Sequence, residues 1–574
     1  MIIIARLVQL QIINPEKFDK EAEKNSIKTI ITTPARGLMF DRNNRLLVDN
    51  KPSYTVTITK SEFDTANISL IASLLGTDAK FIRENLRKIE GTNRFMPARI
   101  MRDVDFSVIA FIEENRDILK GVDYSIEPIR LYPTEFRASH LIGYTKEISE
   151  AMLKKQEDDY YRQGDLIGTT GLEAGYEKYL RGEKGYKFIL QDYRGREVGQ
   201  LNDGANDIKP VSGMDLILSI DSEVQKYAEQ LLEGKTGGIV AIDPNNGEII
   251  CLVSKPDFDL NHFSGKLSPK VWTALNTDPL KPLFNRATQS KYPPGSTYKM
   301  VSAIASLQEG IMKPSSTIFC GGSFKYGDKV FKDHGATGNT GFITSIEKSS
   351  NVFYYKLVLM IGLDNWNKYG RMFGFGEKTG IDIPEETRGL LPSTEYYNKV
   401  YGPKGWTQGY VVSLGIGQGE LGVSPLQMAV YTSILANGGT FYQPHIVRYL
   451  KNPYTGEVTP VSYRKHELPV NKEYFKIIQR GMYLVVQGNG TARKIRTPLV
   501  DISGKTGTAQ NPHGRDHSWF IAYAPSENPR IAICVMVENA GFGAAVAAPI
   551  AQRIILKYLF GVTNESQLEN VDGD

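Results

Sequence analysis

Ser296 and Lys299 are the first residues in the sequence whose types and spacing could do chemistry. They stand three residues apart in Ser-Thr-Tyr-Lys, after a Tyr-Pro-Pro-Gly segment and at the expected start of an apolar helix. Positions three apart share one helix face, and the free N–H groups of a first helical turn favour an oxyanion. An amine beside a serine hydroxyl can act as its general base when burial or a second cation lowers the pKa of the amine. Taken alone, the same tetrapeptide is also common by chance.

Ser349 and Asn351 form a second pair, two residues apart in an expected loop before an apolar helix. A hydroxyl and an amide so placed can project into one cleft, where the hydroxyl relays a proton and the amide bonds a peptide group. Capping of the following helix is the structural alternative for these residues.

Lys505, Thr506, Gly507 and Thr508 form a third group, in an expected strand. The lysine and threonine side chains can hold a carboxylate, and Gly507 removes the side chain that would keep another backbone at a distance. An ordinary glycine in an edge strand is the alternative interpretation of this group.

The elements that must position these groups follow from the periodicity of the apolar residues. After Gly213 the pattern predicts a strand over 215–220, a helix over 222–233, a hairpin over 238–254, mostly helices over 268–450, strands over 500–509, 518–523 and 531–537, and a helix over 545–560. Strands at both ends with helices between them predict an α+β domain, in which helical layers sandwich one antiparallel sheet.

The sequence before Gly213 is irregular and rich in strand-like segments. It predicts a strand through 54–58 and short helices over 68–75, 79–89, 106–118 and 171–180. We therefore expect a short apolar segment over 1–13, a β-rich first domain over 14–212, a larger second domain over 213–562, and a polar tail over 563–574.

Composition narrows the possible functions. Of the 574 residues, 41% are hydrophobic and 23% charged, as in folded globular proteins. A net charge of +4 gives no concentrated basic surface, so nucleic acid is not an expected partner. Cys320, Asp328, Asp333 and His334 lie within one short segment. Their spacing matches no standard zinc pattern, and we expect no metal and no other cofactor.

Taken together and in this order, Ser-x-x-Lys, Ser-x-Asn and Lys-Thr-Gly-Thr resemble the active-site motifs of the penicillin-binding proteins and serine β-lactamases. Each motif supports the other two. The similarity covers nearly the whole chain and includes segments 285–286, 413–419 and 436–439. The first region, with its Arg36-Gly37 pair and segments 140–144 and 168–173, resembles the non-catalytic pedestal of the class B penicillin-binding proteins.

This resemblance implies a peptidoglycan D,D-transpeptidase that cross-links stem peptides through a serine acyl-enzyme. Ser296 would attack the carbonyl of the penultimate D-alanine, and Lys299 would take the proton of Ser296. The backbone N–H groups of Ser296 and Thr508 would stabilise the oxyanion, while Ser349 and Lys505 would relay the proton to the leaving amine. β-Lactams would acylate the same serine. The expected substrate-binding residues are Asn351, Thr506, Gly507 and Thr508.

Within class B, the segment 261–286 is most similar to the penicillin-binding protein 2 type, which implies a role in cell-wall elongation and cell shape. A division-type transpeptidase, a D,D-carboxypeptidase or β-lactamase, and a β-lactam-sensing receptor remain as alternatives. The large pedestal argues against a free hydrolase. Glu420 follows a Gly-Gln-Gly segment in the second domain, but its position in the sequence assigns it no role.

The implied substrate also sets the expected location. Stem peptides are carried on lipid-linked precursors and nascent glycan outside the bacterial cytoplasmic membrane, so we expect a single N-terminal anchor there. Residues 1–13 are apolar but too few to span a bilayer, and are either the outer end of such an anchor or an ordinary amphipathic helix. The sequence before residue 213 leaves no room for a glycan polymerase, so we expect a polymerase as membrane partner, and the resemblance implies a SEDS-family glycosyltransferase.

Overall fold

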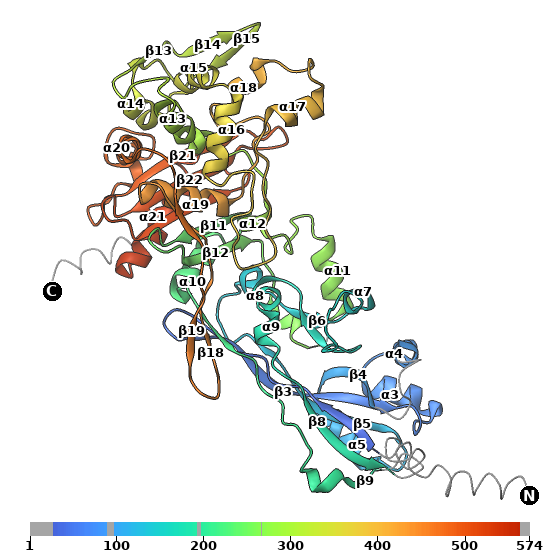
Figure 1. Cartoon of the computed structure of the whole chain (residues 1–574). Coiled ribbons are helices and arrows are strands. Elements are labelled where there is room, and N and C mark those ends of the chain that lie inside the picture. The colour runs from blue at the N-terminus through green and yellow to red at the C-terminus, as the bar shows by residue number, and fades with distance from the viewer. Residues whose placement is uncertain (1–26, 89–96, 192–196, 266, 563–574) are drawn as a thin grey trace, which may run out of the picture.

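The computed structural model describes residues 27–88, 97–191, 197–265 and 267–562. The molecule is elongated, and the two regions expected from the sequence form its two ends (Figure 1). The expected anchor segment 1–13 and the polar tail 563–574 lie outside the described residues. Within the described part of the chain, none of the helices combines the length and apolar character needed to cross a bilayer.

The first region is built on long strands, because its sequence is rich in Val, Ile, Thr and Tyr. Its strands are β1 (Ile27–Thr32), β2 (Met39–Phe40), β3 (Leu46–Thr59), β4 (Pro97–Val104), β5 (Val122–Leu131), β6 (Thr145–Glu147), β7 (Leu166–Gly168), β8 (Gly185–Gln191) and β9 (Glu197–Gln200). Its helices are η2 (Thr65–Asn67), α3 (Ile68–Leu74), α4 (Ala79–Lys88), α5 (Phe106–Glu114), α6 (Ser139–Ile142), α7 (Glu150–Leu153), α8 (Gly171–Gly175), α9 (Glu177–Leu180) and η3 (Leu201–Gly204).

The predicted helices at 68, 79 and 106 begin where the periodicity places them. With β3, β4 and β5 they enclose a small apolar core around Val56, Ile71 and Ile112. The helix predicted over 171–180 is wrong in one respect. It breaks at Tyr176, whose φ of −113° and ψ of 21° separate α8 from α9.

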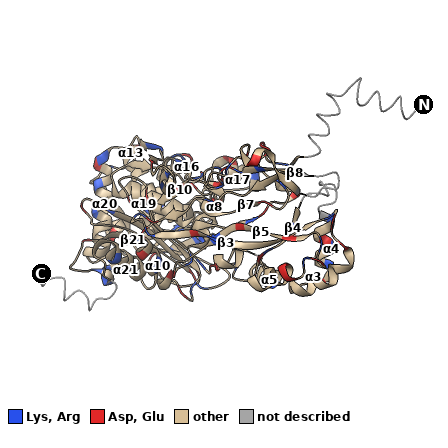
Figure 2. Ribbon diagram, turned by 90° about the horizontal axis from the view of Figure 1, so that it is seen from below, with Lys and Arg blue, Asp and Glu red and all other residues tan. Residues whose placement is uncertain are grey.

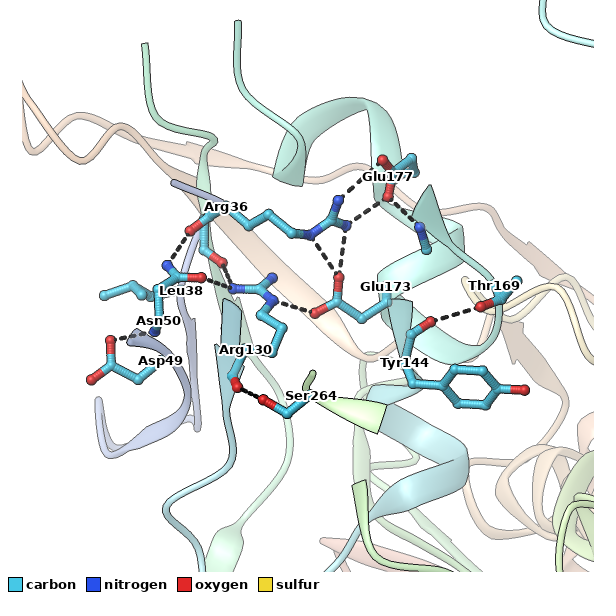
Figure 3. Close-up of polar contacts among 12 residues, drawn as sticks. Arg36, Leu38, Asp49, Asn50, Arg130, Tyr144, Thr169, Glu173, Glu177 and Ser264 are labelled. Atoms are coloured by element: carbon cyan, nitrogen blue, oxygen red, sulfur yellow. Dashed lines mark hydrogen bonds and ion pairs between the residues drawn. The ribbon is translucent and has the colours of Figure 1, made fainter. Parts of the chain in front are cut away.

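A buried ion-pair network joins distant parts of this pedestal (Figure 3). The Glu173 carboxylate, which is 0% exposed, accepts from Arg130 Nε at 2.7 Å and from Arg36 Nη2 at 2.7 Å. Arg36 also pairs with Glu177 at 2.6 Å, and Arg130 donates to Asn50 Oδ1 at 3.1 Å. Buried charges persist in a protein when they are paired and hydrogen-bonded in this way.

The second region alternates strands and helices along the chain. Its strands are β10 (Asp215–Leu218), β11 (Gly237–Ile242), β12 (Ile249–Lys255), β13 (Ile318–Cys320), β14 (Ser323–Tyr326), β15 (Lys329–Lys332), β16 (Gly338–Thr340), β17 (Thr440–Tyr442), β18 (Val447–Lys451), β19 (Val458–Pro460), β20 (Lys465–Glu467), β21 (Ser503–Ala509), β22 (His517–Ala524) and β23 (Ile531–Val537).

Its helices are α10 (Ser222–Leu231), η4 (Leu260–Phe263), α11 (Pro269–Thr277), α12 (Arg286–Gln289), η5 (Gly295–Tyr298), α13 (Lys299–Gln308), α14 (Phe342–Glu347), α15 (Asn351–Ile361), α16 (Leu363–Met372), α17 (Thr394–Tyr401), α18 (Gln408–Leu414), α19 (Pro425–Ala436), α20 (Lys472–Gln487), η6 (Arg493–Ile495) and α21 (Ala547–Phe560). The expected dominance of helices over 268–450 is wrong for 318–340, where β13 to β16 form short hairpins.

One antiparallel sheet in the order β12-β11-β23-β22-β21 organises this region. Every residue of β11, β12, β22 and β23 is buried, so both faces of the sheet are covered. Helix α19 packs on the central strands, while α10 and α21 pack on each other and on the strands. This architecture confirms the α+β sandwich predicted from the sequence. Strand β21 is left at the edge, and the site forms beside it.

Strand β10, predicted as the start of the second domain, pairs with both regions. It runs parallel to β2 of the first region and antiparallel to β18 of the second, in a seven-stranded sheet. We therefore propose residue 213 as the junction between domains 14–212 and 213–562, which share this sheet. Basic and acidic residues are scattered along both regions (Figure 2).

Candidate active site

Ser296 lies at the edge of the five-stranded sheet, in the short 3₁₀ turn η5 that leads directly into α13. The helix itself begins at Lys299, so the serine precedes it rather than occupying its first turn as predicted. Gly295 makes this turn possible. Its φ is +59°, and a Cβ there would lie 2.5 Å from the carbonyl oxygen of Thr508. Only glycine can therefore hold the serine this close to β21.

Lys299, the first residue of α13, is fully buried, with 0% of its surface exposed. Its Nζ donates to Ser349 O at 2.7 Å and to Asn351 Oδ1 at 2.8 Å, and lies 3.3 Å from Ser349 Oγ. No hydrogen bond joins Lys299 Nζ to Ser296 Oγ in the described structure. Burial first, and then the positive charge of Lys505, hold the pKa of Lys299 well below its usual value.

Ser349 and Asn351 lie where α14 ends and α15 begins. Ser349 has a φ of +57°, a strained conformation for a residue with a side chain. Ser350, between them, caps α15 by accepting from Phe353 N. Ser350 is thus the residue that caps the helix, as the structural alternative considered from the sequence supposed for this segment. Ser349 and Asn351, on either side of it, line the cleft.

Lys505, from the edge strand β21, completes the buried group. Its Nζ donates to Ser349 Oγ at 2.8 Å, so one hydroxyl lies between two lysine amines. Burial lowers the pKa of Lys505 to about 7. At neutral pH a second proton on this pair is costly, because the two amines share one buried neighbour.

Gly507 allows β21 to pack closely against η5, as the sequence predicts. A Cβ at Gly507 would lie 2.6 Å from Pro294 O and 2.8 Å from Thr297 Cγ2. Distances this short are not tolerated between non-bonded atoms. Any other residue would push the strand away from the serine.

The open edge of β21 offers polar groups to a ligand. Thr506 Oγ1 is bonded to Thr491 Oγ1 at 2.7 Å, and Thr508 O accepts from Gln418 Nε2 at 2.8 Å. The N–H and C=O of one strand residue point to the same edge. The N–H of Thr508 therefore points to the edge that also bears Ser296.

A cleft of about 590 Å³ connects these groups. Its lining includes Ser296, Ser349, Asn351, Thr506 and Thr508. Lys299 and Lys505 do not line it and are each 0% exposed, but both bond to Ser349, which does line it. The three groups predicted from the sequence thus converge on one site, from a helix start, a loop and a strand edge.

Asp333 is the residue of this site whose role was missed. Its carboxylate accepts from the backbone N–H groups of Asn351 and Val352 and from Ser350 Oγ, each at 2.8 Å. Although burial opposes it, these bonds lower the pKa of Asp333. An anion at the start of α15 is favoured by the helix dipole. Asp333 thereby fixes the loop that carries Ser349.

The short segment considered for a metal has a structural explanation for Asp333 and Cys320. The Asp333 carboxylate accepts hydrogen bonds from the start of α15. Cys320 lies buried in β13, where its Sγ contacts Ile318 O. Among the described residues, no group of three or more His, Cys, Asp or Glu side chains is arranged to hold a metal ion. Gln418 and Thr491 were also missed as site residues, although Gln418 lies in the family-like segment 413–419.

A cleft serine, two buried lysines and an open strand edge are the geometry of a serine acyl-transfer enzyme. The chain belongs to the penicillin-binding protein family. Residues 237–556 match the model of the penicillin binding protein transpeptidase domain, and residues 31–218 match that of the penicillin-binding protein dimerisation domain.

Individual relatives resemble the chain over nearly its whole length. The peptidoglycan D,D-transpeptidase MrdA of Acinetobacter baumannii is 35% identical over 95% of this chain and 84% of its own. The penicillin-binding protein PBP2 of Helicobacter pylori, solved in complex with MreC, superimposes with a TM-score of 0.81 at 28% identity, covering 93% of this chain and 100% of that one. A chain from a peptidoglycan synthase complex, described for the coordination of polymerization and crosslinking, gives a TM-score of 0.73 at 28% identity, with 98% and 96% coverage.

Proposed function

We propose that this protein is a peptidoglycan D,D-transpeptidase of the penicillin-binding protein 2 type, acting through a Ser296 acyl-enzyme. The observation that carries the proposal is the placement of Ser349 Oγ between Lys505 Nζ at 2.8 Å and Lys299 Nζ at 3.3 Å, in the cleft that Ser296 lines. This arrangement supplies a neutral base and a proton relay without a histidine.

In the acylation step, Ser296 Oγ attacks the carbonyl carbon of the penultimate D-alanine. Neutral Lys299 keeps two N–H donors for its two short bonds and uses its lone pair to take the serine proton. The proton transfer requires a small closing movement between Lys299 and Ser296, as is usual when a substrate enters an empty site. The backbone N–H groups of Ser296 and Thr508 receive the negative charge that develops on the carbonyl oxygen.

The leaving group departs as the amine of the terminal D-alanine. Its proton comes from Lys299 through Ser349, with Lys505 on the other side of the hydroxyl to keep the relay polarised. Thr506 and Thr508 hold the terminal carboxylate, and Asn351 bonds the donor peptide. An acceptor amine then attacks the ester, a new amide forms and Ser296 regains its proton.

Product analysis tests this proposal. The full chain is incubated with a pentapeptide stem ending in D-alanyl-D-alanine and an amine acceptor, beside Ser296→Ala. We expect release of D-alanine and a cross-linked amide from the wild type only. Release without transfer would favour the carboxypeptidase or β-lactamase alternative, and labelling by penicillin without any turnover would favour a receptor.

We also propose a role in elongation and cell shape. The relatives named MrdA, and the PBP2 solved with MreC, support this over a division role. Depletion in the source organism should give rounded cells. Filamentous cells would favour a division-type enzyme instead.

We further propose that the protein is held at the outer face of the cytoplasmic membrane and binds a SEDS-family glycosyltransferase through its pedestal. The match to a synthase complex that coordinates polymerization and crosslinking supports a polymerase partner. Full-length protein purified from native membranes should bring the polymerase with it, and a form without residues 14–212 should not. Retention of the polymerase by the shortened form would contradict the pedestal contact.

A further inference from the structure

A second groove opens beside the catalytic cleft. It has a volume of about 310 Å³ and lies between the β14–β15 hairpin and the segment from α18 to Glu420. Phe331, Ser413 and Lys329 line both the groove and the cleft, so the two are continuous. A ligand bound at Ser296 can extend into this groove without leaving the protein surface.

Glu420 places a negative charge at the groove. Its carboxylate accepts from the hydroxyl of Tyr397 at 2.8 Å and from that of Tyr401 at 3.2 Å. Burial, and then the bond to Glu420, raise the pKa of Tyr397, so this hydroxyl keeps its proton and donates. The chain, as far as it is described, provides no Lys, Arg or His in an ion pair with Glu420. The carboxylate is oriented by two neutral donors and keeps free acceptor positions.

Aromatic rings pack against the two tyrosines that bond this carboxylate. Tyr397 stacks on Trp406 with ring centroids 5.1 Å apart, and Tyr401 lies 5.0 Å from Tyr410. Tyr401 is 40% exposed and Tyr410 37% exposed. Aromatic faces attract cations, and Tyr326 and Tyr410 line the groove together with Glu420, so an ammonium group there would have aromatic rings as well as a carboxylate beside it.

We propose that this groove binds the amine-bearing side chain of a peptidoglycan stem peptide, with its ammonium group at Glu420. The inference rests on the proposed function, because transfer requires a stem peptide that carries a free amine. The acceptor amine must be free to attack the Ser296 ester, so the stem whose side chain lies in this groove is the donor, which carries the same amine before cross-linking. The continuity of groove and cleft lets a stem whose end reaches Ser296 place its side chain there.

The other charge in the groove fits the same ligand. Lys329 belongs to the β14–β15 hairpin, whereas Glu420 belongs to the opposite wall of the groove. The Nζ atom of Lys329 lies 5.1 Å from the ring centroid of Phe331. A cation and an anion on separate elements suit a side chain in which a carboxylate accompanies the amine. Glu420 alone would suffice for a side chain that has only the amine.

The test compares Glu420→Gln with the wild-type full chain. Glutamine keeps an oxygen for the tyrosine hydroxyls but removes the charge. Fluorescent penicillin should label both proteins at the same rate, because Ser296 is untouched. The KM for a donor that carries a free side-chain amine should rise roughly tenfold, the loss expected for a charged hydrogen bond. The KM for the same donor N-acetylated should stay unchanged, so the variant loses the preference for the free amine.

Two further variants guard against a merely structural effect. Tyr410→Leu removes one aromatic face without touching the bonds of Glu420, and should weaken the same amine-bearing peptide by roughly threefold. Glu457→Gln, on an exposed turn after β18, should change nothing. Equal behaviour of free-amine and acetylated peptides with every variant, while penicillin still labels, would overturn the inference. A wild-type protein that is labelled by penicillin but never transfers a peptide would refute the proposed function instead. The hydrolysis rates of the free-amine and N-acetylated donors would then still test whether the groove binds the amine.

Discussion

At the scale of single residues, the chemistry depends on two lysines that the fold deprives of water. Lys299 and Lys505 are both 0% exposed and both reach Ser349 Oγ. Among the described residues neither lysine forms an ion pair with a carboxylate, and burial lowers both pKa values. A lysine in this state is a base at neutral pH, which an exposed lysine is not.

The protonation state of Lys299 should govern the pH dependence of acylation. Because the base acts when deprotonated, the rate of reaction with penicillin should rise with pH through a pKa well below the ~10.4 of a free lysine. Lys299→Arg should lose at least two orders of magnitude, because a guanidinium does not deprotonate in this range. Stopped-flow labelling from pH 5 to 10 measures both. An arginine variant that acylates normally would remove Lys299 from this role.

Asp333 should act on the reaction through the position of Ser349. Asp333→Asn removes the charge that caps α15, which should cost about 1–2 kcal/mol of stability. Acylation should fall roughly tenfold, because Ser349 no longer holds its strained φ. Asp328→Asn, on the exposed turn of the same hairpin, is the control and should behave as wild type. Thermal melting and penicillin labelling check both effects, and equal labelling of the two variants would contradict this role.

The sequence predicts the catalytic residues better than their supports. Ser296, Lys299 and Lys505 belong to short motifs in which residue type and spacing carry the chemistry. Asp333 and Glu420 act through partners on other elements, Asp333 on α15 and Glu420 with two tyrosines of α17. Their local sequence does not predict such contacts.

At the scale of elements, the site depends on how closely η5 approaches the edge of β21. Gly295, Gly507 and Gly417 each lie so near a neighbouring backbone that a Cβ would come within 2.6 Å of a carbonyl oxygen. The catalytic turn and the strand therefore pack backbone to backbone. This contact aligns the serine with the N–H of Thr508.

Gly507→Ala should separate these two elements. The added Cβ meets Pro294 O at 2.6 Å, and backbone must move to relieve that contact. We expect penicillin acylation to fall by about two orders of magnitude, because small misplacements of reacting groups are costly. Gly335→Ala is the control, since a Cβ there meets no atom within 4 Å. Labelling kinetics would contradict the account if the two variants reacted equally fast.

Periodic elements could be predicted, and irregular or non-local ones could not. The strand over 531–537 and the helices beginning at 68 and 106 are local patterns, and the structure confirms them. The strands within 318–340 have only three or four residues each, which is too short for a clear periodic signal. The pairing of β10 with β2 and β18 joins residues far apart in the chain, which periodicity cannot reveal.

At the scale of the whole molecule, the pedestal is connected to the catalytic region by polar contacts as well as by the shared sheet. Tyr176 donates to Asp382 Oδ2 at 2.9 Å, and Gly171 N donates to Glu385 Oε2 at 3.0 Å. Both donors lie at α8, the helix that carries Glu173 of the buried network. The network thus braces the helix that contacts the catalytic region.

Glu173→Gln should weaken the pedestal without removing the catalytic chemistry. The substitution leaves Arg130 and Arg36 buried with less compensating charge, which costs about 3–5 kcal/mol. We expect a clearly lower melting temperature, while the folded protein still reacts with penicillin at Ser296. Glu183→Gln, exposed on the same region, should melt as the wild type does. Identical melting of the two variants would show that the network does not support the pedestal.

The central claim is that Ser296 is the nucleophile. Its most direct test is mass spectrometry of the full chain after reaction with a β-lactam, followed by mapping of the modified peptide. The account predicts one adduct, located at Ser296, and none in a folded Ser296→Ala variant. An adduct on any other residue, or one that persists in Ser296→Ala, would contradict it.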